Sequence, residues 1–387
     1  MIEPNVARPE GQVLRVLMAT PFGSRQRGGM DRLTDIIIDT AESRGNGRVQ
    51  ISRLVTRGPG SLASAPAVFS VALARLWLAK RRGDVDALHI HVAAGGSAIR
   101  KAILARFARS LGIPYIVHLH GSRFHQFWDV AGPRARKLVD RMFAESSATI
   151  VLGNFWAKLV ADHVPAVRSK ILILPNATAP MHLCHEPADD GRVRISFLGE
   201  VGARKGTPQL VSALGQLADR RDWTATIAGN GSVEETIAAS RQLGIGDRVS
   251  VPGWLDGAGT TDVLRKTDIF VLPSFAENLP MSILEAFAAG AAVVATPVGA
   301  VPDVITHDKN GLLVEAGDVD GLASALRRLI ADRDLRNALG AAAKRDHAER
   351  YNIENYVTRL EDIWLNAALP GARAGLAGDW TFKINTY

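Results

Sequence analysis

Short runs of apolar residues recur along this chain, and segments long enough for helices separate them. The runs show little polar alternation, which is typical of parallel strands buried on both faces. Repeated strand–helix units predict α/β domains with doubly wound parallel sheets. We expect strands at 13–19, 49–55, 87–92, 115–119, 149–152 and 171–174, and then at 193–198, 224–228, 249–251, 269–272, 292–295 and 311–314.

Two sets of such units predict two Rossmann-like domains that face a cleft. The segment 176–192 is rich in turn formers and has no clear period, so we place the join there. We expect an N-terminal, acceptor-binding domain at 1–180 and a C-terminal, donor-binding domain at 190–350. Helical patterns at 321–331, 333–346 and 353–365 follow, and we expect the last part, 351–387, to pack back toward the first domain. No structure is predicted for the tail 370–387.

Composition narrows the class of protein. Apolar residues make up 47% of the 387 residues, so the chain can bury substantial cores. No apolar run reaches the roughly 18 residues of a membrane-spanning helix, and the first residues lack the apolar core of a signal peptide. The single Cys184 allows no internal disulfide and no metal site built on cysteines. These features favour a cytoplasmic protein.

Charge is divided unevenly along the chain. Residues 1–176 carry 25 Lys and Arg against 12 Asp and Glu, whereas residues 177–387 carry 21 against 27. A basic half attracts phosphates, anionic lipid or nucleic acid, although a solvated Arg-rich surface is an equal alternative. Few aromatic residues are interleaved with the cations, which disfavours stacking on single-stranded nucleic acid. We therefore expect no nucleic-acid partner.

A cationic loop follows the first expected strand of the second half. Phe-Leu-Gly-Glu-Val-Gly-Ala-Arg-Lys-Gly spans 197–206, and a helical pattern then begins, with Thr207 as its expected N-cap. Arg204 and Lys205 therefore precede a helix N-terminus, which disfavours cations unless an anion binds there. A guanidinium and an ammonium together can neutralise a diphosphate and stabilise it as a leaving group. We predict a diphosphate site here; a solvated pair of cations is the alternative.

A second loop follows the strand expected at 269–272. Pro-Ser-Phe-Ala-Glu-Asn-Leu-Pro-Met-Ser-Ile-Leu-Glu-Ala-Phe-Ala-Ala-Gly spans 273–290, and a helix is expected at 280–290. Glu277 lies in the loop, and Glu285 interrupts an otherwise apolar helix. A carboxylate accepts hydrogen bonds from two hydroxyl groups, which suits a ribose diol or a hexose. Backbone amides near Asn278 and Leu279 can meet a phosphate or sugar oxygen.

These two loops, in this order, resemble those of glycosyltransferase family 4, the retaining enzymes with the GT-B fold. The resemblance covers almost the whole chain and is strongest from 193 to 314. It implies a hexosyltransferase whose donor is a nucleotide diphosphate-sugar, either GDP-mannose or a UDP-hexose, with a slight preference for GDP-mannose. It further implies that Arg204 and Lys205 contact the donor phosphates, that Glu285 holds the ribose hydroxyls, and that Glu277 contacts the transferred hexose as a catalytic residue.

The same resemblance gives roles to residues of the first half. Gly28 and Gly29 follow the first strand, where the family has a loop over the donor phosphate. His120 precedes Gly121 at the end of a strand, and the resemblance assigns such a histidine to the donor hexose as a second catalytic residue. His118 shares its strand face by period-two alternation and is more simply a buried core residue.

Further donor contacts are implied in the second half. Asn230 lies in a Gly-rich turn near the donor sugar, at a place where the family commonly has Asp, so the role of its side chain stays open. Gly253 and Trp254 are implied to lie beside the nucleotide base, although Trp254 alternatively belongs to ordinary packing.

The acceptor site is expected in the basic first half. His91, near a strand end, and Arg123 and Phe124, after another strand, are its candidates. The stretch 68–80 is apolar, contains Trp77 and ends in cations, which suits either a membrane interface or a buried helix. Because many members of the family extend lipid-linked saccharides, we expect a saccharide or lipid-linked acceptor in exopolysaccharide or lipopolysaccharide assembly. We also expect peripheral binding to the inner, anionic face of the cytoplasmic membrane.

No metal or other cofactor is expected. Two Asp-Val-Asp triplets occur, at 84–86 before a strand and at 318–320 before a helix, and we interpret both as turn and cap residues. An epimerase of this architecture would lack the paired loops, and a phosphorylase would need a pyridoxal lysine that is not recognisable. The remaining alternative is a catalytically inactive sugar-nucleotide-binding or scaffold subunit of the same fold.

Overall fold

The computed structural model describes residues 13–23, 29–45, 48–59, 62–181 and 191–368. The chain forms two compact units. Unit 1 comprises Met1–Pro175 and Ile353–Tyr387, and unit 2 comprises Asn176–Asn352. The chain therefore leaves unit 1 once, at Pro175, and returns to it at Ile353. Among the described residues, no helix combines the length and the apolar character needed to cross a bilayer.

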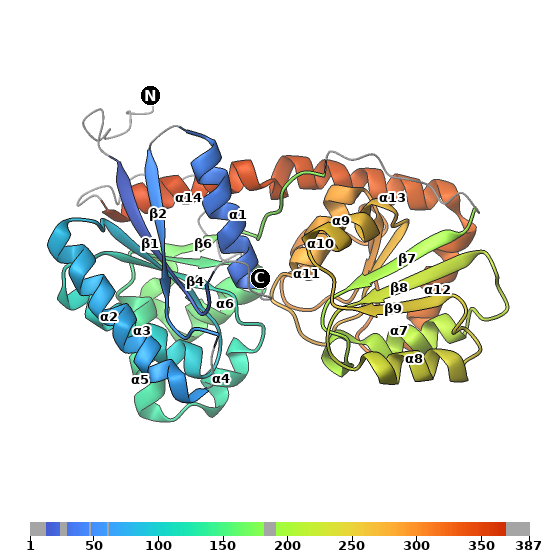
Figure 1. Cartoon of the computed structure of the whole chain (residues 1–387), viewed down its shortest axis with the longest axis horizontal. Coiled ribbons are helices and arrows are strands. Elements are labelled where there is room, and N and C mark those ends of the chain that lie inside the picture. The colour runs from blue at the N-terminus through green and yellow to red at the C-terminus, as the bar shows by residue number, and fades with distance from the viewer. Residues whose placement is uncertain (1–12, 24–28, 46–47, 60–61, 182–190, 369–387) are drawn as a thin grey trace. The chain divides into compact units, whose positions relative to one another are not determined.

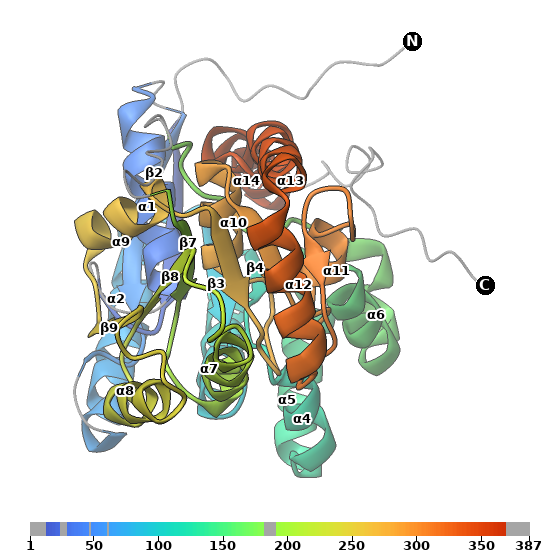
Figure 2. The ribbon, with the colours of Figure 1, turned by 90° about the vertical axis from the view of Figure 1, so that its right-hand side faces the viewer.

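Unit 1 is built on a six-stranded parallel sheet with the strand order β2-β1-β3-β4-β5-β6. The central strands β3 and β4 are buried along their whole length, and apart from three histidines their residues are largely apolar. Helices α1 and α14 cover one face, and α2, α3 and α5 cover the other (Figures 1 and 2). The strands are Leu14–Thr20 (β1), Val49–Val55 (β2), Ala87–Val92 (β3), Tyr115–Leu119 (β4), Ala148–Val151 (β5) and Ile171–Ile173 (β6). The helices are Gly29–Ser43 (α1), Ala65–Arg82 (α2), Gly96–Ser110 (α3), Phe124–Val130 (α4), Pro133–Ala144 (α5), Asn154–His163 (α6) and Ile353–Ala368 (α14).

Unit 2 repeats this architecture with the strand order β12-β11-β10-β7-β8-β9, again with parallel pairs. Helices α7 and α8 lie together on one side of β7, β8 and β9, and α9 and α10 lie on the opposite side (Figures 1 and 2). The strands are Val193–Leu198 (β7), Trp223–Ala228 (β8), Val249–Gly253 (β9), Ile269–Leu272 (β10), Ala292–Ala295 (β11) and Leu312–Leu313 (β12). The helices are Thr207–Gly215 (α7), Val233–Gln242 (α8), Gly257–Arg265 (α9), Met281–Ala289 (α10), Val301–Val304 (α11), Val319–Ala331 (α12) and Arg333–Asp346 (α13).

The prediction of two doubly wound α/β sheets is confirmed. In unit 1 the chain runs from β1 outward to β2 and then back to β3, so its direction of winding reverses between β1 and β3. In unit 2 the same reversal lies between β7 and β10. Connections leave such neighbouring strands in opposite directions, which opens a crevice at their carboxyl ends where ligands of this fold bind. These two strand pairs are therefore the places to look for a site.

Candidate functional site

The reversal point of unit 2 brings the cationic loop beside the end of β10. The loop after β7 closes in a short 3₁₀ turn (Ala203–Lys205) and then Gly206, which adopts a φ of +72°. A Cβ atom at Gly206 would lie 2.0 Å from the carbonyl oxygen of Pro273, directly after β10. The backbone amide of Phe275 also donates to the Arg204 carbonyl at 2.9 Å. Only glycine permits this close approach, which holds the two loops together.

This packing places the predicted cations against the predicted carboxylate loop. Nζ of Lys205 lies 2.5 Å from Oε1 of Glu277, and both side chains are nearly buried, at 12% and 8% exposure. The Arg204 guanidinium donates to the Ala276 carbonyl at 3.3 Å and to Glu200 at 2.7 Å. The structure therefore brings Glu277 together with Arg204 and Lys205, which lie more than 70 residues before it in the sequence.

The start of helix α7 differs in detail from the prediction. Thr207 is the first helical residue rather than the N-cap, and its hydroxyl donates to the Gly202 carbonyl at 3.2 Å. Gly206 occupies the N-cap position, because the left-handed turn that seats the loop on Pro273 needs glycine there.

The backbone around Glu277 is held by residues that the sequence did not point to. Gly299, with a φ of +61°, packs so closely that its Cβ would lie 2.2 Å from the Glu277 carbonyl oxygen. The amide of Ala300 donates to the Asn278 carbonyl at 2.8 Å, and the side chain of buried Asn176 donates to the Leu279 carbonyl at 2.8 Å. The consecutive carbonyls of this loop are thus fixed by distant parts of the chain, and only their contacts in space reveal it.

Glu285 lies one turn inside α10, which begins at Met281 and is followed by Gly290 as its left-handed C-cap. The helix is buried from Ile283 to Ala289, and Glu285 itself is only 8% exposed. A carboxylate at this depth needs polar partners, because burying a charge without them is costly. Glu285 is therefore not an exposed surface residue of α10.

The other donor residues predicted in unit 2 lie at the ends of β8 and β9. The Asn230 carbonyl accepts from the Val201 amide at 2.7 Å, so the Gly-rich turn lies against the cationic loop, and the Asn230 side chain is exposed. Gly253 ends β9, and its carbonyl accepts from the Gly229 amide at 2.8 Å. Trp254 is 46% exposed, so it is not a core residue.

In unit 1, the loop after β1 leads into helix α1, which begins at Gly29. Gly28 lies outside the described residues. Buried Asp31, in the first turn of α1, accepts from the Phe22 amide at 3.2 Å and thereby ties the loop to the helix. Burial raises the pKa of the Asp31 carboxyl, and this outweighs the effect of the Phe22 amide and of the Arg53 guanidinium nearby.

Two of the three acceptor candidates need correction. His91 is fully buried, so its ring cannot meet an acceptor; instead its Nδ1 lies 2.8 Å from Nε2 of His120. Phe124 is also fully buried, and its ring packs on those of Trp128 and Phe143 at centroid distances of 4.7 and 5.8 Å. The Phe124 ring is therefore part of the hydrophobic core and not of a surface site. Arg123 is exposed and stays a candidate.

A histidine cluster occupies the ends of β3 and β4. Among the described residues, His89, His91 and His118 bring ring nitrogens within 4.8 Å of one another, as metal ligands would. However, the indole N–H of Trp364 donates to Nδ1 of His89 at 2.9 Å. A neutral imidazole has one lone pair, so His89 must carry its proton on Nε2 and has none left for a metal. The cluster fits a hydrogen-bonded network better than a metal site.

The two Asp-Val-Asp triplets have structural roles, as expected. Asp318 is the N-cap of α12, and its carboxylate accepts from the Gly321 amide at 2.8 Å. Asp86 precedes β3 and accepts from the Arg15 amide at 2.8 Å. The first triplet lies at the amino end of β3, and in the second Asp320 accepts from the Gln216 side chain at 2.7 Å.

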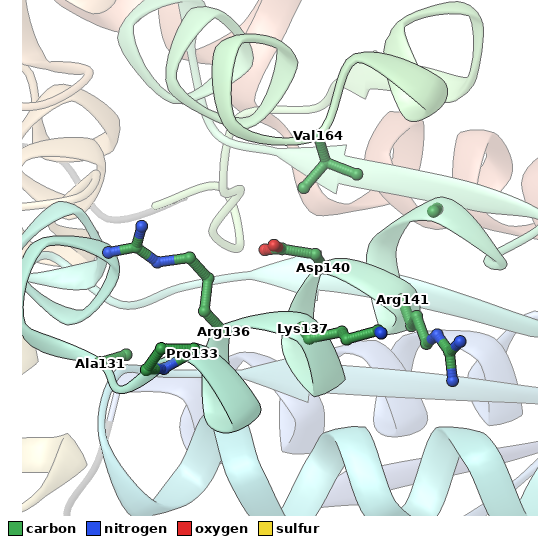
Figure 3. Close-up of a pocket in the computed structure, with 8 residues that line it drawn as sticks. Ala131, Pro133, Arg136, Lys137, Asp140, Arg141 and Val164 are labelled. Atoms are coloured by element: carbon green, nitrogen blue, oxygen red, sulfur yellow. The ribbon is translucent and has the colours of Figure 1, made fainter.

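An open hollow of about 660 Å³ lies beside α5 in unit 1, lined by Arg136, Lys137, Asp140 and Arg141 (Figure 3). Two of its polar groups have structural partners: Asp140 accepts from the Trp128 indole at 2.9 Å, and Arg136 donates to the Trp128 carbonyl. None of the predicted site residues lines this hollow, so we do not associate it with the donor or acceptor.

Comparisons with known proteins follow the same division of the chain. Residues 14–177 match the family described as "Glycosyl transferase 4-like domain", and residues 185–346 match the family described as "Glycosyl transferases group 1". The first match covers the sheet of unit 1, and the second contains the cationic loop, Glu277 and Glu285.

Individual proteins give similar results. The chain is 27% identical over 305 residues to a 2-deoxystreptamine glucosyltransferase of Streptomyces kanamyceticus, covering 74% of this chain and 78% of that one. It is 31% identical over 184 residues to a GDP-mannose-dependent alpha-(1-6)-phosphatidylinositol monomannoside mannosyltransferase of Mycobacterium tuberculosis, covering 44% of this chain and 47% of that one. The structure of sucrose-phosphate synthase from Thermosynechococcus elongatus matches with a TM-score of 0.74 at 15% identity, covering 91% and 98% of the two chains, which shows a shared fold.

Proposed function

Because the chain belongs to the glycosyltransferases, with a 4-like domain followed by a group 1 domain in a GT-B fold, we propose that it transfers a hexose from a nucleotide diphosphate-sugar to a saccharide acceptor with retention of configuration. The observation that carries this proposal is the position of the Lys205–Glu277 pair, which lies at the reversal point of unit 2. Cations and carboxylates that meet there suit a ligand with both phosphates and sugar hydroxyls.

In the proposed reaction, the bond between hexose C1 and the diphosphate oxygen breaks, and its electron pair leaves with the diphosphate. The acceptor hydroxyl oxygen bonds to C1 on the same face, and its proton passes to a phosphate oxygen. Arg204 and Lys205 stabilise the developing negative charge, so no metal is needed for this step. Glu277 positions the hexose by accepting hydrogen bonds from its hydroxyl groups, and the same-face attack needs no covalent intermediate on this residue.

We propose GDP-mannose or a UDP-hexose as the donor. The similarity to a GDP-mannose-dependent mannosyltransferase over 184 residues supports the former, and the similarity to a glucosyltransferase over 305 residues supports the latter. Exposed Trp254, after β9, would lie beside the base in either case.

We propose that the acceptor is a lipid-linked saccharide and that the protein binds the inner, anionic face of the cytoplasmic membrane. Helix α2 supports this. Val71, Trp77 and Leu78 are exposed on it at 56%, 42% and 39%, although apolar side chains this large are usually buried. Its last turn carries Lys80, Arg81 and Arg82, and the Arg81 guanidinium lies 4.8 Å from the Trp77 ring. Exposed aromatic and apolar residues beside cations suit an anionic lipid surface.

A donor panel tests the proposed function. Thermal-shift measurements with UDP-glucose, GDP-mannose, UDP and GDP should show a higher Tm with one nucleotide and its sugar, because a ligand that binds the folded state stabilises it. The shift should be lost in Lys205→Ala and kept in the control Lys266→Ala, which removes a lysine of unit 2 paired with Asp262 instead.

Product analysis completes the test. NMR of the transferred sugar should show the same anomeric configuration as in the donor; an inverted product would contradict the retaining mechanism. Donor binding without hydrolysis or transfer would favour the inactive binding or scaffold subunit. If no nucleotide-sugar raises the Tm, the donor assignment is wrong.

A further inference from the structure

The ends of β3 and β4 carry four histidines that belong to two separate hydrogen-bonded chains. The parallel register places His91 opposite His118 and puts the alternate residues His89 and His120 on the same side of the sheet. Ring centroids of neighbouring histidines lie 4.0 to 5.3 Å apart. Each contact between two imidazoles joins one N–H to one lone pair, so a chain whose first donor is known fixes every proton along it.

The first hydrogen-bonded chain begins at Trp364 of α14. Its indole N–H donates to Nδ1 of His89, so His89 carries its proton on Nε2 and donates to Nδ1 of His118 at 3.1 Å. His118 must then carry its proton on Nε2. That nitrogen is buried and finds no partner among the described residues, so the chain ends there without reaching His120.

The second hydrogen-bonded chain begins at Thr34, in the first turns of α1. The Thr34 hydroxyl donates to the Met30 carbonyl at 2.9 Å, so its oxygen can only accept from Nε2 of His91, which lies 3.5 Å away. With its proton on Nε2, His91 has a lone pair on Nδ1 and accepts from Nε2 of His120 at 2.8 Å. His120 therefore holds its proton on the nitrogen that faces His91, and its Nδ1 is left with a lone pair.

We propose that His91 is a positioning residue that fixes the tautomer of His120, so that His120 offers Nδ1 to a sugar hydroxyl as a hydrogen-bond acceptor. This inference rests on the proposed function and on the contact with the donor hexose that the family resemblance implies for His120, but the tautomer itself does not depend on either. It also gives a role to His91, which is too deeply buried to meet an acceptor directly.

The surroundings keep the network neutral. Burial lowers the pKa of His120 to about 3 and the pKa of His91 well below its usual value. Buried Lys101, whose Nζ donates to the Ala19 carbonyl at 2.6 Å, further disfavours a positive charge on His91. A histidine with so low a pKa is a poor general base near neutral pH, so accepting a hydrogen bond is the role that suits it.

Three variants separate positioning from packing. His91→Phe keeps a ring but has no acceptor. His91→Asn places an amide oxygen near the position of Nδ1 and can still accept from His120. His89→Phe is the matched control, because His89 is a buried histidine two residues away on the same strand. It belongs to the hydrogen-bonded chain that begins at Trp364, not to the one that contains His91 and His120.

Tautomers can be read directly by ¹⁵N NMR of histidine-labelled, ligand-free protein. We expect His120 to carry its proton on Nε2 in the wild type, in His91→Asn and in His89→Phe, and to show mixed tautomers in His91→Phe. In transfer assays with UDP-glucose and GDP-mannose, His91→Phe should lower kcat/KM about 10- to 100-fold, as loss of an orienting partner typically does. His91→Asn should recover most of that activity.

A wild-type His120 protonated on Nδ1 would overturn the inference, whether or not any variant folds. So would a folded His91→Phe with wild-type kcat/KM. If the wild type transfers neither sugar while the NMR result is as expected, the proposed function fails and the tautomer assignment stands, so the two failures are distinguishable.

Discussion

Nζ of Lys205 and Oε1 of Glu277 lie 2.5 Å apart, although 72 residues separate them in sequence, and each neutralises the charge of the other in a nearly buried place. This ion pair joins the loop after β7 to the loop after β10. In the proposed reaction, the donor diphosphate is a stronger anionic partner for Lys205 than a single carboxylate. Glu277 would then be released to accept hydrogen bonds from the hexose hydroxyls, so the pair links donor binding to hexose positioning.

Replacing Glu277 by Gln should separate donor binding from transfer. Arg204 and Lys205 remain to hold the diphosphate, so the Tm shift caused by the donor should persist. Transfer should fall about 100-fold or more, because an amide cannot hold two hydroxyls as a carboxylate does and a small misplacement of the hexose is costly. Glu200→Gln is the matched control: Glu200 also pairs with a site cation, but its side chain is 58% exposed. It should lose less than about fivefold, and unchanged turnover in Glu277→Gln would remove Glu277 from any central role.

Replacing Lys205 by Met should weaken both the site and the fold. The change leaves the Glu277 carboxylate nearly buried without its partner, so the free energy of unfolding should fall by about 2 kcal/mol in chemical denaturation. The double variant Lys205→Met/Glu277→Gln should recover part of this loss, because the unpaired charge is gone. Equal stabilities of the single and double variants would mean that the pair contributes nothing to the fold.

Gly299 supports Glu277 from behind and should not tolerate a side chain. A Cβ would lie 2.2 Å from the Glu277 carbonyl oxygen and 2.6 Å from that of Asn278, at a φ of +61°. Gly299→Ala should therefore cost about 1–3 kcal/mol of stability and also reduce transfer, because the loop must shift. Gly257→Ala is the control: a Cβ there meets no atom within 4 Å at the start of α9. It should change stability by less than about 1 kcal/mol, and an equal effect of both substitutions would contradict this view of the loop.

The sequence allowed the strands and the loops after them to be predicted, because buried parallel strands produce continuous apolar runs and their ligands bind at the carboxyl ends. Helix α13 was predicted with its observed bounds, Arg333 to Asp346, and in the structure Asp332 caps its start. Glu285 interrupts an otherwise apolar helix in the sequence, and the structure buries it together with its apolar neighbours.

Residues that act through distant contacts could not be predicted in this way. Asn176 holds the Leu279 carbonyl across 103 residues, and nothing in its local sequence indicates that contact. His91 looked like an acceptor residue because it lies near a strand end, but the register with β4 places it behind His120. Phe124 was predicted to bind the acceptor because it comes after a strand, but its ring packs in an aromatic core with Trp128. In each case the decisive information is which segments become neighbours.

Acid should destabilise unit 1 through its histidine cluster. Burial lowers the pKa of His89 from 6.5 to about 3, with His120 and Lys101 adding to the effect. A histidine whose pKa is lowered in the folded state is protonated first in the unfolded state, so its contribution is present above pH 6.5 and is lost as the pH falls toward 3. At pH 5 this costs about 2 kcal/mol for His89 alone. Denaturation curves between pH 8 and 4 should show this loss, and His89→Phe should reduce its slope. A stability that is flat down to pH 4 would show that these histidines are already protonated in the folded protein or are not buried.

Membrane binding should depend on the exposed residues of α2. Wild-type protein should float with vesicles of phosphatidylglycerol at low salt and much less with phosphatidylcholine, because the cations of the last turn contribute about 1 kcal/mol each at an anionic surface. Trp77→Ser combined with Leu78→Ser should abolish most of this flotation, since it removes the apolar contact. Leu243→Ser is the control, because Leu243 is as exposed, at 43%, but lies after α8 in unit 2. If wild-type protein stays at the bottom of the gradient at low salt, or if the control loses flotation equally, α2 is not a membrane-binding surface.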